Sequence, residues 1–187
     1  MNNFSLGSCF FIVLILVAYC LEAKAQACRP SGRIKGKVPP NQCKAELDSD
    51  CCIEGKFYST YTCSPPVSTP TKAVLTLGSF SNAIDGGSYS IGCDDKYHSD
   101  DTPVVALSTG WYNKGERCLD IITISANGRS VNALVVNECD STRGCDEDND
   151  YEPPCGNNIV DASKEVWKAL GVPRDDWGEL DITWSGH

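Results

Sequence analysis

Histidine and basic residues are scarce in this chain, and their scarcity excludes several classes of function. Among 187 residues there are only two histidines, His98 and His187. They leave little material for a histidine-rich metal site or for a catalytic triad relayed by histidine. The chain has 16 basic and 25 acidic residues, which gives a net charge of −9. Because this charge repels a phosphate backbone, a nucleic acid is excluded as the partner.

Motifs for metal binding are also missing. The chain has no pair of Cys-x-x-Cys motifs of the kind that holds structural zinc. An acidic run at 146–150, between Cys145 and Cys155, is superficially similar to a calcium loop. Counted from its first residue, the sixth position is Tyr151 instead of glycine and the twelfth is Asn157 instead of glutamate. We therefore predict a solvated acidic loop here, and neither a metal ion nor any other cofactor.

The first segment has the features of a secretion signal. An uncharged apolar run at 10–18 precedes Ala23 and Ala25, small residues at the two positions that a signal peptidase recognises. We predict that residues 1–25 are a signal peptide and that the mature chain begins at Gln26. The alternative is a membrane anchor, for which about 20 apolar residues are needed. After cleavage we expect a secreted, extracellular monomer that makes no contact with a membrane.

Cysteine is abundant, and its arrangement predicts a disulfide framework. Adjacent Cys51 and Cys52 are expected to bond to different partners, since a ring between neighbours strains the peptide. Five cysteines fall within 26–63, so at least one bridge must reach the later part of the chain. The pairing itself stays open. The mature chain keeps an even number of cysteines, as in a secreted protein with five bridges: Cys28, Cys43, Cys51, Cys52, Cys63, Cys93, Cys118, Cys139, Cys145 and Cys155.

Composition divides the mature chain into two parts. Residues 26–70 have little apolar periodicity and end in a proline-rich connector at 64–70. Such a segment cannot bury a core of its own, so we predict a loop-rich extension held by disulfides. Residues 71–187 instead show short β-branched or apolar runs separated by glycine and asparagine turns, which indicates a mainly β domain. The expected strands are 73–77, 104–108, 118–124, 130–137 and 180–184.

Two local signals are more specific than the strand pattern. Asn127-Gly128 between two apolar runs predicts a hairpin turn. A helix is predicted over 162–170, with Asp161 as its N-cap and with Gly171 and Pro173 after its end. The apolar residues of these elements are the expected core: Val104, Ile122, Ile124, Val131, Leu134, Val136 and Ile182.

Five motifs in fixed order resemble the kiwellins, also called ripening-related proteins of plants. They are YTCSPPV at 61–67, VALSTGWYN at 105–113, VVNECDS at 135–141, NNIVD at 157–161 and LDITWS at 180–185. The chain is similar to the short form, which lacks an additional cysteine-rich module at the mature N-terminus. The resemblance implies a six-stranded double-psi β-barrel, the fold of barwin-like proteins and expansins. It also implies secretion into the apoplast and a role in defence or ripening.

The same resemblance implies a function without catalysis. Family members bind and inhibit secreted pathogen effector proteins, such as chorismate mutase. Asp161 matches by motif position an acid of related wall-loosening barrels, and its simpler role is the N-cap. Enzymes that hydrolyse glycosidic bonds need a second carboxylate, and residues 108–113, where it is expected, contain none. We therefore predict no catalytic residue. The alternative function is a polysaccharide-binding or weakly wall-loosening protein similar to expansins.

Aromatic residues are the expected binding residues. Trp111 and Tyr112 form either an aromatic platform for a sugar ring or an anchor at a protein interface, and the alternative is that Trp111 fills the core. Tyr97 and Tyr151 lie in expected loops, where tyrosine offers a large contact at small entropic loss. We predict that a partner binds through Trp111, Tyr112, Tyr97 and Tyr151, with Asp161 as a further candidate.

Overall fold

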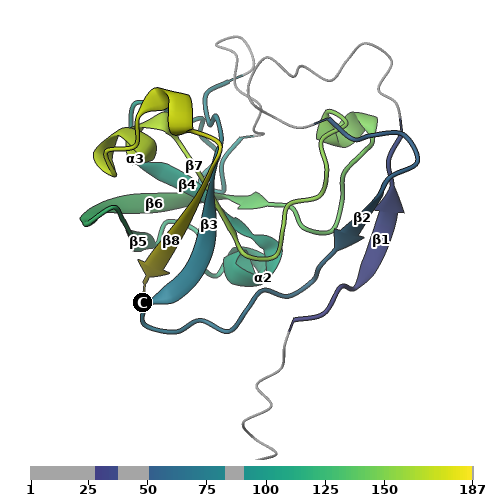
Figure 1. Ribbon diagram of the computed structural model, residues 1–187, viewed down its shortest axis with the longest axis horizontal. Coiled ribbons are helices and arrows are strands. Elements are labelled where there is room, and N and C mark those ends of the chain that lie inside the picture. The colour runs from purple at the N-terminus through teal and green to yellow at the C-terminus, as the bar shows by residue number, and fades with distance from the viewer. Residues whose placement is uncertain (1–27, 38–50, 83–90, 187) are drawn as a thin grey trace, which may run out of the picture.

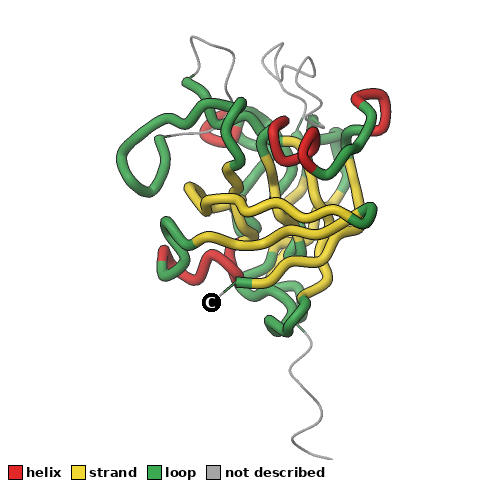
Figure 2. The backbone as a smooth tube through the Cα atoms, turned by 90° about the vertical axis from the view of Figure 1, so that its left-hand side faces the viewer, coloured by secondary structure: helices red, strands yellow, loops and turns green. Residues whose placement is uncertain are grey.

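Six strands close into a barrel in the order β3-β7-β4-β6-β5-β8 (Figures 1 and 2). The computed structural model describes residues 28–37, 51–82 and 91–186, so the predicted signal peptide 1–25, Gln26 and Cys43 lie outside the described residues. Two strand pairs, β3 with β7 and β4 with β6, are parallel, and the others are antiparallel. This is the expected double-psi β-barrel. Its strands are β3 (Thr71–Leu77), β4 (Val104–Ser108), β5 (Ile121–Ala126), β6 (Arg129–Cys139), β7 (Ile159–Ala162) and β8 (Glu179–Ser185).

The strands follow from the sequence pattern where that pattern is strongest. β4 is buried along its whole length because it lies between β6 and β7. β5 and β6 form the predicted hairpin, with Asn127 at φ 51° and Gly128 at φ 70° in its turn. Both angles lie in the left-handed region that asparagine and glycine tolerate. The hairpin prediction is therefore confirmed.

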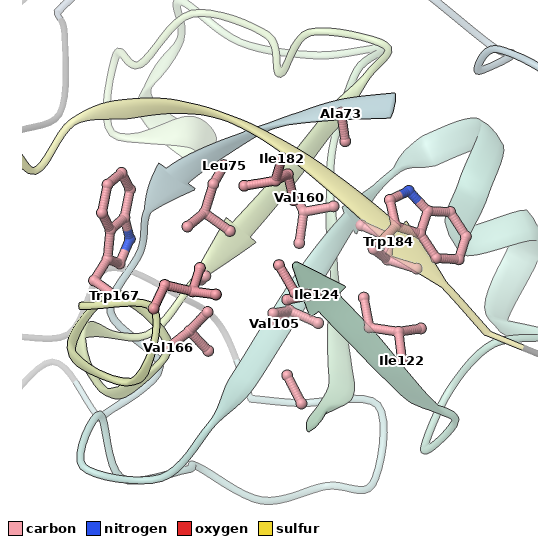
Figure 3. Close-up of a cluster of buried hydrophobic side chains, with 14 of the residues drawn as sticks. Ala73, Leu75, Val105, Ile122, Ile124, Val160, Val166, Trp167, Ile182 and Trp184 are labelled. Carbon is pink, nitrogen blue, oxygen red and sulfur yellow. The ribbon is translucent and has the colours of Figure 1, made fainter. Parts of the chain in front are cut away.

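The barrel interior is filled by one large apolar cluster (Figure 3). Side chains from all six strands meet the helix α3 (Lys164–Ala169), which contributes Val166 and Trp167. Successive residues of a strand point to opposite faces, so Val104 and Ala106 of β4 leave the interior. With Phe80 and Val136 they form a second, smaller cluster on the outer face of β4 and β6. Of the expected core residues, Val131 and Leu134 are half-buried, and those that are fully buried are Val104, Ile122, Ile124, Val136 and Ile182.

The prediction that Asp161 caps a helix is wrong. Asp161 belongs to β7, and α3 begins only at Lys164, with Ser163 at its N-cap position. The helix cannot begin earlier because residues up to Ala162 are paired with β3 and β4. The Ser163 hydroxyl makes no capping bond and donates instead to the carbonyl of Thr102 at 2.6 Å. Other helical turns, which the sequence did not predict, are α2 (Thr109–Tyr112), η3 (Asn113–Gly115), η4 (Glu147–Asn149) and η5 (Arg174–Asp176).

The extension forms a small sheet outside the barrel, in which β1 (Gly32–Lys35) pairs antiparallel with β2 (Phe57–Thr60) (Figure 1). Cys28–Cys63 closes this segment, and Cys52–Cys145 joins it to the barrel across 93 residues. Cys52 therefore does not bond to Cys51, and one bridge crosses to the later part of the chain, as predicted. The remaining described bridges are Cys93–Cys118 and Cys139–Cys155, and Cys51 is also disulfide-bonded.

The extension is expected to unfold before the barrel when the disulfides are reduced. Its sheet buries little apolar surface, whereas each bridge stabilises the folded state by typically 2–4 kcal/mol. The barrel instead has the buried clusters described above. Limited proteolysis after mild reduction should therefore cut first between residues 28 and 63, with unreduced protein as the control. Early cuts within the barrel, with the extension intact, would contradict this division.

Candidate functional site

Asp161 is held in the barrel wall by strand register. Its Cα partners are Thr76 on β3 and Ala106 on β4. The residue is 7% exposed, and its Oδ1 accepts a hydrogen bond from the Thr76 hydroxyl. The Thr76 carbonyl in turn accepts a hydrogen bond from the indole N–H of Trp167 at 3.2 Å. The result is a nearly buried carboxylate and hydroxyl pair, fixed by two strands and a helix.

The strand faces separate Asp161 from Glu138, a carboxylate close to α2. Asp161 is paired across the strands with Ala106, which belongs to the outer cluster. Glu138 is level with Leu107, which belongs to the interior cluster, and it accepts a hydrogen bond from the Thr109 hydroxyl at 2.6 Å. Because directly paired residues share a face of the sheet, the two carboxylates lie on opposite faces. They are not placed to flank one glycosidic bond.

Asp100 has a structural task in the described loops. Its Oδ2 accepts a hydrogen bond from the Ser79 hydroxyl and its Oδ1 from the backbone N–H of Phe80, both at 2.6 Å. These bonds tie the segment after β3 to the segment before β4.

No group of three or more residues suited to a metal ion, and no helix long and apolar enough to cross a membrane, occurs in 28–37, 51–82 or 91–186.

Trp111 lies in the core, as the alternative interpretation predicted. It is fully buried, and its ring meets Trp184 edge-on at 5.3 Å between centroids. Its indole N–H donates to the carbonyl of Pro65 at 2.8 Å. A Cβ at Gly110 would lie 2.1 Å from the backbone nitrogen of Ser64, so glycine is required for this close approach. Trp111 therefore anchors the connector to the barrel and is not a surface platform.

The three candidate tyrosines differ in exposure. Tyr112 is half-buried. Its burial, with a smaller contribution from the negative charge of Glu138, raises the pKa of Tyr112. The Tyr112 hydroxyl therefore stays protonated. Tyr151 is also half-buried, and its carbonyl accepts a hydrogen bond from the backbone N–H of Cys52 at 2.9 Å. Its backbone thus helps to dock the extension. Only Tyr97 is strongly exposed among them, at 51%.

Tyr97 belongs to an exposed apolar surface that sequence reasoning missed. The turn that brings it near Ile91 is closed by a hydrogen bond from the Gly92 N–H to the Lys96 carbonyl. Cys93–Cys118 joins this turn to the segment that leads into β5. We call the four exposed side chains on these two segments the Cys93–Cys118 surface: Ile91, Tyr97, Leu119 and Ile121. The sequence signal that could have predicted this surface is the presence of large apolar residues next to cysteines in otherwise polar loops.

The backbone under this surface is firmly held. The N–H groups of Cys93 and Leu119 donate to the neighbouring carbonyls of Val136 and Val135, both at 2.8 Å. Leu119 has φ 65°, a left-handed conformation that costs a bulky residue about 1 kcal/mol or more. The loop must therefore be held in place by its surroundings, of which the adjacent bridge is one.

A charged group sits beside the same turn. The Asp94 carboxylate accepts a hydrogen bond from the ring of His98 at 3.0 Å and lies 3.7 Å from the ammonium group of Lys96. The hydrogen bond with His98 holds the pKa of Asp94 below its usual value, although burial opposes this. Asp94 therefore remains ionised beside the apolar side chains.

Comparison with known proteins agrees with the resemblance seen in the sequence. A ripening-related protein 3 of Oryza sativa is 49% identical over 166 residues, which cover 87% of this chain and 76% of that protein. Kiwellin of Actinidia chinensis is 48% identical over 172 residues, 89% of this chain and 79% of kiwellin. An expansin of Clavibacter michiganensis has 18% identity and a TM-score of 0.45 over 63% of this chain and 50% of its own. The family described as Kiwellin-1 matches residues 13–187, and the chain therefore belongs to the kiwellin family.

Proposed function

We propose that this protein is a non-enzymatic binding protein of the plant apoplast that captures and inhibits a secreted pathogen effector protein. The observation that carries the proposal is the Cys93–Cys118 surface, where four large apolar side chains are exposed on a disulfide-held backbone. Large apolar side chains exposed on neighbouring segments are a feature of protein interaction sites. The disulfides and the kiwellin family indicate a secreted protein.

The rigidity of this surface favours binding. Ordering a loop on association lowers affinity, so a surface that is already fixed retains more of the interaction energy. Tyr97 adds a large ring with few rotatable bonds. We propose that inhibition occurs by steric blocking, because a barrel docked over the active site of an effector prevents access of its substrate.

Charge adds a preference for basic partners. Residues 71–187 contain nine basic and 20 acidic residues, a net charge of −11. Such a field accelerates encounter with a positively charged protein and weakens as salt is added. We therefore expect an effector with basic residues around an apolar contact region.

Partner capture tests the proposal with a matched pair of variants. Ile121 and Ile53 are 62% and 60% exposed, but only Ile121 lies in the Cys93–Cys118 surface. Ile121→Ala should lower the affinity for the captured effector about tenfold, because a central apolar contact is lost, and Ile53→Ala should leave it unchanged. The partner is identified by pull-down from pathogen secretions and then titrated with each variant. Equal losses for both variants would place the interface elsewhere.

A second candidate function is a polysaccharide-binding or weakly wall-loosening activity, for which the Asp161–Thr76 pair is the candidate site. We propose that this pair is structural. Wild-type protein should release no sugar from chitin, cellulose or mixed-linkage glucan, and Asp161→Asn should bind the effector as the wild type does. The control is Asp181→Asn, at an exposed residue of β8. Sugar release by the wild type that disappears in Asp161→Asn alone would contradict the non-enzymatic proposal, since asparagine cannot deliver a proton.

A further inference from the structure

The two faces of the β1–β2 sheet differ in character. Lys35 is paired with Phe57, and Arg33 is paired with Ser59. Residues two apart on a strand, and residues directly paired across strands, share a face. Arg33, Lys35 and Phe57 therefore stand together on one face, and all three are exposed. The opposite face contains Ile34 and Tyr58, which are half-buried. We call the exposed set Arg33, Lys35 and Phe57 the cationic face.

This face is positive on a strongly negative protein. The described part of the extension contains one acidic residue, Glu54, beside five basic ones: Arg29, Arg33, Lys35, Lys37 and Lys56. Neither Arg33 nor Lys35 forms an ion pair within the described parts of the chain. Both side chains are exposed on β1, where an external anion can reach them. The barrel, with its net charge of −11, offers the opposite sign.

An aromatic ring lies beside Arg33. Phe57 is 55% exposed, and the guanidinium carbon of Arg33 is 4.7 Å from its ring centroid. On the other side of the sheet the ammonium group of Lys56 is 4.9 Å from the ring centroid of Tyr58. The Arg33 contact holds cation and ring together, and cation–π attraction of this kind is worth about 0.5–1 kcal/mol at an exposed site. An exposed phenylalanine also leaves apolar surface uncovered.

The sheet is fixed at several points. Backbone hydrogen bonds run from the Ser31 N–H to the Thr60 carbonyl at 2.8 Å and from the Gly36 N–H to the Lys56 carbonyl at 2.7 Å. A Cβ at Gly36 would lie 2.1 Å from the carbonyl oxygen of Ile53, so the two segments are in close contact there. With Cys28–Cys63 and Cys52–Cys145 these contacts give the cationic face a fixed shape before any ligand arrives.

We propose that the cationic face binds a polyuronate, a polysaccharide whose sugar rings each bear a carboxylate. The apolar C–H face of a sugar ring can cover the part of the Phe57 ring that Arg33 leaves exposed, and so remove apolar area from water. The carboxylates of the same chain can then pair with Arg33, whose planar fork suits a carboxylate, and with Lys35. This surface is separate from the Cys93–Cys118 surface, so the proposal goes beyond effector capture.

The alternatives match fewer of these features. An acidic peptide offers carboxylates on flexible stems without an apolar face beside them, so it leaves Phe57 without a contact. A double-stranded nucleic acid carries one negative charge per about 1.7 Å of helix axis, so the acidic barrel repels it strongly. A neutral polysaccharide leaves both cations without a partner. A polyuronate supplies the ring and the charges together.

Calorimetric titration of the mature protein with purified oligogalacturonate tests the proposal. We expect binding that weakens as salt is added, because exposed charges contribute to it. Arg33→Gln or Lys35→Gln should weaken binding about two- to fivefold, and Phe57→Ala about tenfold. The matched controls, Lys72→Gln and Ile121→Ala on the barrel, should leave it unchanged. Every variant except Arg33→Gln and Lys35→Gln keeps all the charges of the β1–β2 sheet. The folding of each variant is checked by thermal unfolding.

Comparison ligands separate the alternatives. The methyl-esterified oligogalacturonate keeps the sugar face without the charge, and polyglutamate keeps the charge without the sugar, so both should bind much more weakly. No binding by the wild type overturns the proposal. Polyglutamate or single-stranded DNA binding as tightly as oligogalacturonate, without a change in Phe57→Ala, identifies a general anion surface and overturns it as well. The proposal is also overturned if Lys72→Gln and Lys35→Gln weaken oligogalacturonate binding equally.

Discussion

Strand β7 is hydrogen-bonded on both sides, to β3 and to β4, and the positions of most other elements depend on this pairing. It has only four residues, yet its pairing with both neighbours completes the barrel. The pairing sets Val160 and Ala162 in the interior and turns Asp161 toward the outer face. It also determines where α3 can begin. One short strand thereby fixes the core, the start of the helix and the orientation of the Asp161 carboxylate.

The sequence was informative where local chemistry decides the structure. Asn127-Gly128 fixed its own turn, and β4 was predicted with its observed ends because a fully buried strand is a continuous apolar run. β7 was missed because it has only four residues, of which Asp161 and Ala162 also fit the cap and first residue of the helix that follows. Only the neighbouring strands, which are distant in sequence, decide between the two structures. The same limit explains why Asp161 was assigned to a helix cap.

The candidate sites show a similar boundary between local and tertiary information. Exposure of Tyr97 could be predicted from its polar loop, whereas burial of Trp111 depends on Trp184 and on the connector that reaches back from residue 65. No local pattern placed an aromatic ring beside the basic residues at 33–37, and it is the pairing of β1 with β2 that brings Phe57 to Arg33. Chain elements that meet only in the folded state create both proposed surfaces.

The long bridge from Cys52 to Cys145 has a consequence for the order of assembly. A chain that enters an oxidising compartment from its N-terminus delivers Cys52 first and its partner 93 residues later. The extension can be locked in place only after most of the barrel sequence has been translocated. A chain truncated before residue 145 retains an unpaired thiol at Cys52, which offers quality-control enzymes a chemical mark of incomplete synthesis.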